Sequence, residues 1–63
     1  MIVVTRLNDK RFVLNAALIK SIEETPDTLI TLTTGDKIMV KEAMNEVVQK
    51  AIEFGRQVRS FQV

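Results

Sequence analysis

Apolar and polar residues alternate along the first 40 residues of the chain in five short runs. The runs are rich in Val, Ile, Leu and Thr and cover residues 2–7, 11–14, 18–24, 28–33 and 37–40. A period of two, combined with many β-branched side chains, is typical of half-buried strands. The pattern therefore predicts five β-strands.

Short polar segments separate these runs. Asn8–Lys10, Thr25–Asp27 and Thr34–Asp36 carry the Asn, Asp, Pro and Gly residues of tight turns. Pro presets φ, Asn and Asp bond nearby backbone, and Gly35 can take positive φ, so each segment predicts a hairpin turn. The fourth break begins at Asn15, which is expected to form an Asx-turn or to cap one short helical turn.

From Lys41 onward the apolar period lengthens to between three and four residues, which predicts an amphipathic helix packed on the sheet. Phe54 widens its apolar face, and Glu46 with Lys50 is placed for an i,i+4 ion pair. Gly55 weakens the case for one continuous helix. The predicted apolar face consists of Met44, Val47, Val48, Ala51, Ile52, Gly55 and Val58.

These elements predict one small α+β domain over residues 1–63. Three hairpins join the strands in order, so we expect a curled antiparallel β-meander of about five strands with one C-terminal amphipathic α-helix. A chain of this length buries only about 60% of the surface that it exposes when unfolded. A second domain is excluded, and the small core calls for additional support.

Both faces of the predicted sheet carry apolar side chains. One face is expected to hold Ile2, Val4, Phe12, Leu14, Ile30, Leu32, Ile38 and Val40, and the other Val3, Leu7, Val13, Leu29 and Met39. One helix covers only one face. The second set is either a group of singly exposed residues, which is normal for a small protein, or a surface covered by another subunit. We expect a homo-oligomer.

The composition offers little chemistry for catalysis. The sequence has no His and no Cys, so it contains neither imidazole nor thiolate ligands. Glu23 and Glu24 are adjacent on a strand and point to opposite faces, while Asp27 and Asp36 belong to different turns. Lys41 is a single amine near a helix start. We therefore predict no enzyme activity, no cofactor and no metal site.

The net charge and the hydropathy of the chain indicate which kinds of partner it can bind. The sequence has nine Lys and Arg residues and eight Asp and Glu residues. The resulting net charge of +1 argues against nucleic-acid binding. No stretch approaches the roughly 20 apolar residues that cross a bilayer. The apolar start has no basic stretch before it and no cleavage site after it, so we expect a cytoplasmic protein.

Three sequence segments resemble a known family. Residues 5–8 read Thr-Arg-Leu-Asn after an apolar strand, residues 22–28 read Ile-Glu-Glu-Thr-Pro-Asp-Thr, and residues 40–42 read Val-Lys-Glu. With the C-terminal apolar helix, this pattern is similar to the FlbD family of flagellar proteins, which includes the swarming motility protein SwrD. Asp9 stands where the family commonly has Gly, and Asp tolerates the left-handed conformation that such a turn needs.

The resemblance implies an accessory protein that supports swarming and flagellar motor power through protein–protein interaction, at the stator or peripherally at the flagellar base. Turns and strand ends present polar groups to partners. The candidate contacts are Arg6, Glu24, Pro26, Asp27 and Lys41. Two alternatives stay open: RNA binding, because residues 1–6 are similar to the start of carbon-storage regulators, and DNA binding of the LytTR type. Neither has an aromatic platform here.

Overall fold

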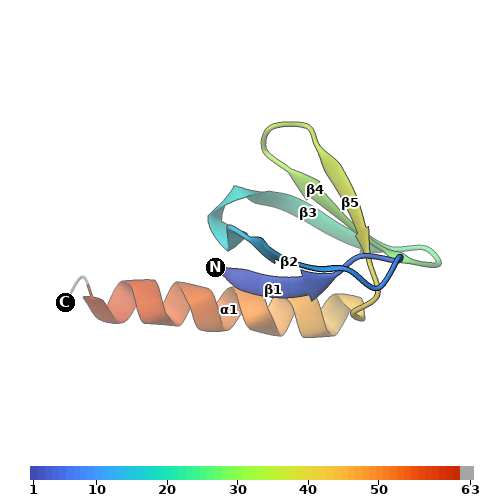
Figure 1. Ribbon diagram of the computed structural model, residues 1–63. Coiled ribbons are helices and arrows are strands. Elements are labelled where there is room, and N and C mark those ends of the chain that lie inside the picture. The colour runs from blue at the N-terminus through green and yellow to red at the C-terminus, as the bar shows by residue number, and fades with distance from the viewer. Residues whose placement is uncertain (62–63) are drawn as a thin grey trace.

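The computed structural model of the chain describes residues 1–61, with side chains through residue 55. Five strands precede a single long helix, as Figure 1 shows, and the predicted α+β class is confirmed. A short 3₁₀ helix, η1 (Ala16–Leu18), links the second and third strands. The other elements are β1 (Ile2–Thr5), β2 (Arg11–Leu14), β3 (Ile19–Glu24), β4 (Thr28–Leu32), β5 (Lys37–Val40) and α1 (Met44–Phe61).

The strands form two antiparallel sheets, whereas the sequence predicted one continuous meander. β1 pairs with β2, and the second sheet has the order β3-β4-β5. The break falls at η1, where the Asn15 side chain accepts a hydrogen bond of 3.1 Å from the Ala17 N–H. The predicted cap at Asn15 is thus confirmed, and the helical turn that it begins carries the chain out of the first sheet.

Backbone contacts join the two sheets at the end where α1 begins. Arg6, just after β1, forms an antiparallel bridge with Val40 at the end of β5. The Lys41 N–H donates to the Thr5 carbonyl at 2.8 Å. Within the second sheet, the Thr33 N–H donates to the Leu18 carbonyl at 2.8 Å and extends the pairing of β3 with β4. These bonds curl the strands around one core, in agreement with the predicted curvature.

Among the side chains that the structure describes, the core contains residues from every strand except β3 and one residue from the helix. Its buried apolar side chains are Ile2, Val4, Leu14, Ile30, Leu32, Val40 and Val47. Phe12 and Ile38 pack against this cluster, so the face predicted to be internal is confirmed. On the opposite face Val3, Leu7, Val13 and Met39 are exposed, while Leu29 is half-buried.

The helix face toward the core includes Val47 and Ala51 as predicted, but it is rotated toward Phe54 and away from Met44, Val48 and Ile52. Val47 is fully buried, and Ala51 and Phe54 are half-buried, with Phe54 packed against the core. Met44, Val48 and Ile52, which were expected to face the core, are 37%, 37% and 42% exposed. Their positions at i, i+4 and i+8 follow one flank of α1. The Val58 side chain lies outside the described residues.

The structure gives the bounds of the helix and tests one predicted ion pair. The helix begins at Met44, three residues after the change of period at Lys41, and it continues through Gly55, where an added Cβ would meet no atom within 4 Å. The predicted Glu46–Lys50 ion pair is not formed. The Lys50 ammonium instead donates to the Val3 carbonyl at 2.7 Å, because β1 leaves that oxygen unpaired at its edge.

Candidate interaction site

Three connections of the chain meet at the end of the molecule where the helix begins. They are the β1–β2 turn (residues 6–10), the β3–β4 hairpin (residues 25–27) and the β5–α1 junction (residues 41–43). Figure 1 shows them close together, and the opposite β4–β5 turn lies far away. We call this surface the helix-start end.

Strand pairing aligns the predicted contact residues across the helix-start end. Arg6 bridges Val40, Val40 pairs with Thr28, and Thr28 pairs with Glu24. Lys41 follows Val40 directly, and Pro26 with Asp27 forms the tip of the hairpin that Glu24 enters. All five candidates, Arg6, Glu24, Pro26, Asp27 and Lys41, are exposed and lie at this one end. Their role as partner contacts stays a prediction.

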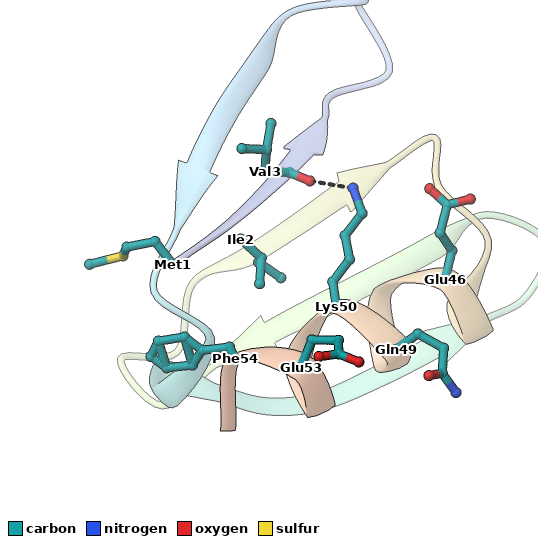
Figure 2. A pocket seen from close by; sticks show the side chains of 8 residues that line it. All are labelled: Met1, Ile2, Val3, Glu46, Gln49, Lys50, Glu53 and Phe54. Atoms are coloured by element: carbon teal, nitrogen blue, oxygen red, sulfur yellow. Dashed lines mark hydrogen bonds between the residues drawn. The ribbon is translucent and has the colours of Figure 1, made fainter. Parts of the chain in front are cut away.

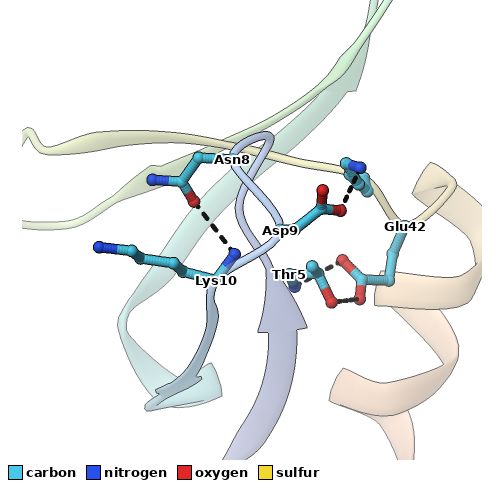
Figure 3. A network of polar contacts seen from close by, with 6 residues as sticks. Thr5, Asn8, Asp9, Lys10 and Glu42 are labelled. Atoms are coloured by element: carbon cyan, nitrogen blue, oxygen red, sulfur yellow. Dashed lines mark hydrogen bonds and ion pairs between the residues drawn. The ribbon is translucent and has the colours of Figure 1, made fainter.

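The β1–β2 turn is held in a defined shape. Asp9 has a φ of 71°, so the left-handed conformation expected at this position is confirmed. Its N–H donates to the Arg6 carbonyl at 2.9 Å, and the Arg6 N–H donates to the Lys10 carbonyl at 2.8 Å. The Lys10 N–H also donates to the Asn8 side chain, as Figure 3 shows. The turn therefore presents its charged side chains from a fixed backbone.

Both basic candidate contacts have partners within the chain. The Arg6 guanidinium lies 4.4 Å from the centroid of the Phe12 ring, in a cation–π contact. Lys41 forms an ion pair with Asp9 across the gap between the β1–β2 turn and the β5–α1 junction. Both cations are therefore oriented, and Arg6 keeps its remaining N–H donors available for a carboxylate or a carbonyl group.

A hydrogen-bonded pair that sequence reasoning missed ties the helix start to β1. The two carboxylate oxygens of Glu42 accept the Thr5 N–H and the Thr5 hydroxyl, each at 2.8 Å (Figure 3). Burial of the Glu42 carboxyl acts to raise its pKa, but these two bonds, together with the Glu42 backbone N–H and the charge of Lys50, outweigh burial and hold the pKa below the usual value. The residues are 37 positions apart, so local sequence carries no signal of the pair.

Glu24 connects the β3–β4 hairpin to the helix. Its Oε2 atom accepts from the Thr28 hydroxyl and from the Met44 N–H, both at 3.4 Å. Met44 is the first residue of α1, where backbone N–H groups have no partner within the helix, and a carboxylate there is favourable. At the tip the Thr25 N–H donates to the Asp27 carbonyl at 3.2 Å, and the Thr25–Pro26 peptide is cis.

A groove of about 370 Å³ lies between the edge of β1 and the helix. Lys50 crosses it to reach the Val3 carbonyl, and Phe54 lies near Met1 at its far side, as Figure 2 shows. Its lining residues are Met1, Ile2, Val3, Glu46, Gln49, Lys50, Glu53 and Phe54. Sequence reasoning did not find the groove, because it depends on how the helix rests against β1.

The described part of the chain contains no cluster of three or more metal-ligating side chains. Among the helices of the described residues, none is long and apolar enough to cross a membrane. The helix-start end carries side chains of both charges. Arg6 and Lys41 are basic, and Asp9, Glu24 and Asp27 are acidic. Such a surface is suited to polar contacts with another protein.

Comparison with known proteins decides the family. The model of the FlbD family, described as flagellar and swarming motility proteins, matches residues 1–59. The chain belongs to this family. No curated protein and no solved structure matches the chain. The match includes all five strands and all five candidate contacts of the FlbD chain, and it supports a role in flagellar motility.

Proposed function

We propose that this FlbD-family protein is a non-enzymatic accessory protein that supports swarming and flagellar motor power by binding another protein. Its location is the cytoplasm, with peripheral attachment at the flagellar base, and its partner is a motor or stator protein. It acts as a homo-oligomer. The observation that carries the proposal is the family match over residues 1–59, which includes the whole helix-start end.

The arrangement of charges supports a protein partner. Arg6 and Lys41 are oriented by contacts within the chain, and acidic groups of Glu24 and Asp27 lie on the same surface. Ordered side chains lose less conformational entropy when they bind, so a preorganised polar surface favours a specific complex. A nucleic acid would instead require an excess of positive charge, and the mixed signs here disfavour it.

The functional test is genetic. A flagellated strain that lacks the gene should swarm less and generate lower motor torque, and the wild-type gene should restore both. Unchanged swarming and torque in the deletion strain would contradict the proposed function. An epitope-tagged copy, crosslinked in motile cells, should then recover a motor or stator protein.

A pair of charge reversals tests the surface. Arg6→Glu changes the helix-start end, while Lys37→Glu makes the same change in charge at the exposed start of β5, away from that end. We expect Arg6→Glu to lose swarming and partner recovery and Lys37→Glu to retain them, with far-UV circular dichroism showing that both variants fold. Equal behaviour of the two variants would mean that the helix-start end is not the contact surface.

A further inference from the structure

The outer edge of β3 has no partner strand in the described chain, since β3 pairs only with β4. The Leu32 N–H donates to the Asp36 carbonyl, so even-numbered residues of β4 bond toward β5 and odd-numbered ones toward β3. The register places Ser21 and Glu23 opposite Thr31 and Leu29. The N–H and C=O groups of Ile22 and Glu24 therefore point outward, where they can pair with another strand.

An apolar flank of the helix lies on the same side of the molecule. Met44, Val48 and Ile52 form this flank, and the groove with β1 lies on the opposite flank of α1. The helix contacts β3, and the bond from the Met44 N–H to Glu24 fixes where the two elements meet. The two elements run in opposite directions, as Figure 1 shows.

We propose that a second copy of this chain docks on this side, with β3 pairing antiparallel to its own counterpart and the two helix flanks packing together. Strand pairing centred on Ile22 would exchange two backbone hydrogen bonds and join two three-stranded sheets into one of six strands. The inference deepens the homo-oligomer of the proposed function and does not depend on the motor partner.

The spacing of the two features fits one two-fold axis. From the Met44–Glu24 contact, Val48 lies about 6 Å along the helix axis, at 1.5 Å per residue. From the same contact, Ile22 lies about 7 Å along β3, at about 3.3 Å per residue. An axis through Ile22 therefore passes beside Val48, the centre of the flank, and brings Met44 against Ile52 of the second copy.

The charges of β3 complement each other about the same axis. Lys20 lies at the irregularity between Ile19 and Ser21, and pairing centred on Ile22 brings it beside Glu24 of the second copy, with the reverse pair formed symmetrically. Both side chains are exposed, and Glu24 accepts from Thr28 and Met44 through Oε2, which leaves its Oε1 atom for Lys20. Charged residues on an edge strand usually prevent pairing, but opposite charges directly across an antiparallel pair are favourable.

A second copy covers more of this surface than a single extended peptide would. A peptide strand would pair with β3 and leave most of Met44, Val48 and Ile52 exposed. A two-fold dimer buries the strand edge and the flank together, and a stable interface of about 800 Å² per subunit needs both. It also supplies the support that a core of seven buried apolar residues calls for.

Light scattering after gel filtration tests the proposal on the purified full chain. The wild-type protein should have twice the chain mass of 7.2 kDa at micromolar concentration. Val48→Lys should raise the dimer dissociation constant at least tenfold, because two ammonium groups would meet at the axis. Val13→Lys is the matched control, since Val13 is 63% exposed on the outer face of β2 and should stay dimeric.

A second pair of variants tests the register. Lys20→Glu places two carboxylates opposite each other and should weaken the dimer severalfold, most strongly at low salt. Lys37→Glu makes the same change in charge on β5 and should leave the mass unchanged. Far-UV circular dichroism on all four variants shows whether each is folded.

Each of these measurements can contradict the proposed two-fold dimer. A monomeric wild-type chain would overturn the dimer and leave the β3 edge to a partner strand, and a trimer would overturn the two-fold axis. Equal effects of Val48→Lys and Val13→Lys would place the interface elsewhere. Because mass is measured on the isolated protein, a failure here leaves the deletion phenotype intact, and a deletion without phenotype leaves the dimer intact.

Discussion

The bond between Thr5 and Glu42 is the clearest place to test how the helix start is attached to the first sheet. Thr5→Val removes the hydroxyl that donates to Glu42 and keeps the size and strand preference of the side chain. The Thr5 N–H still donates to the same carboxylate. The substitution therefore isolates one hydrogen bond to a charged acceptor.

The expected magnitude follows from the surroundings of the bond. A hydrogen bond to a charged group contributes about 1.5–3 kcal/mol, and a neutral one about 1 kcal/mol. Thr5 and Glu42 are both half-buried, so water weakens the bond, and we expect a contribution close to that of a neutral hydrogen bond. We expect Thr5→Val to lower the free energy of unfolding by about 1 kcal/mol at pH 7, equivalent to about 4–8 °C in Tm for a domain of this size.

The effect should depend on pH because the folded-state pKa of Glu42 lies below its ordinary value of 4.5. A carboxyl with a depressed folded pKa contributes stability above its unfolded pKa and loses it as the pH falls through the folded value. In Thr5→Val the pKa of Glu42 is lowered less, so this variant loses less stability in acid. The difference from wild type should therefore shrink below about pH 4.

Urea unfolding followed by far-UV circular dichroism is the suitable assay, since the chain has no Trp or Tyr for fluorescence. All measurements use one protein concentration, because association shifts apparent stability. Thr31→Val is the matched control: Thr31 is half-buried on β4, and its hydroxyl makes no side-chain hydrogen bond within the described residues. Equal losses in both variants, or a Thr5→Val difference that is the same at pH 7 and pH 3, would refute the reasoning.

Three further predictions concern stability and use the same assay. Val47→Ala should cost about 2 kcal/mol because Val47 is fully buried, while Val48→Ala on the exposed flank should change stability by less than about 0.5 kcal/mol when both variants are measured at a concentration low enough to keep the chain monomeric; equal costs would contradict the helix orientation. Gly55→Ala should stabilise the protein by up to about 1 kcal/mol, whereas Gly35→Ala should destabilise it by about 1 kcal/mol because Gly35 has a φ of 95°. Lys50→Met should cost about 1 kcal/mol through loss of the bond to the β1 edge.

The proposed dimer and the helix-start end share one residue. Glu24 caps the first turn of α1 and also lies on the outer edge of β3. If the second copy pairs with β3, the two hairpin tips extend from opposite ends of the joined sheet. Each dimer would then present two copies of the helix-start end, and a bivalent protein binds a repeated partner more tightly than a single copy does.

The local sequence pattern was sufficient to predict the strands and the helix and to predict which face of the strands is buried. The period-two runs placed β2 and β5 at their observed bounds and overextended β1 by two residues, from Thr5 to Leu7. The alternation also separated Ile30 and Val40 from Val13 and Met39 correctly. Period, turn chemistry and the cap at Asn15 depend on residues close in sequence, which is why they could be predicted.

The sequence by itself therefore determined the strands, the hairpin turns, the cap and the absence of His and Cys chemistry. Only the tertiary structure decided which side of α1 faces the core, because the apolar positions from Met44 to Gly55 form a band wider than the contact. Glu24 at Met44 and Lys50 at the Val3 carbonyl fix that orientation. These bonds join segments far apart in the chain, and periodicity carries no information about contacts of that kind.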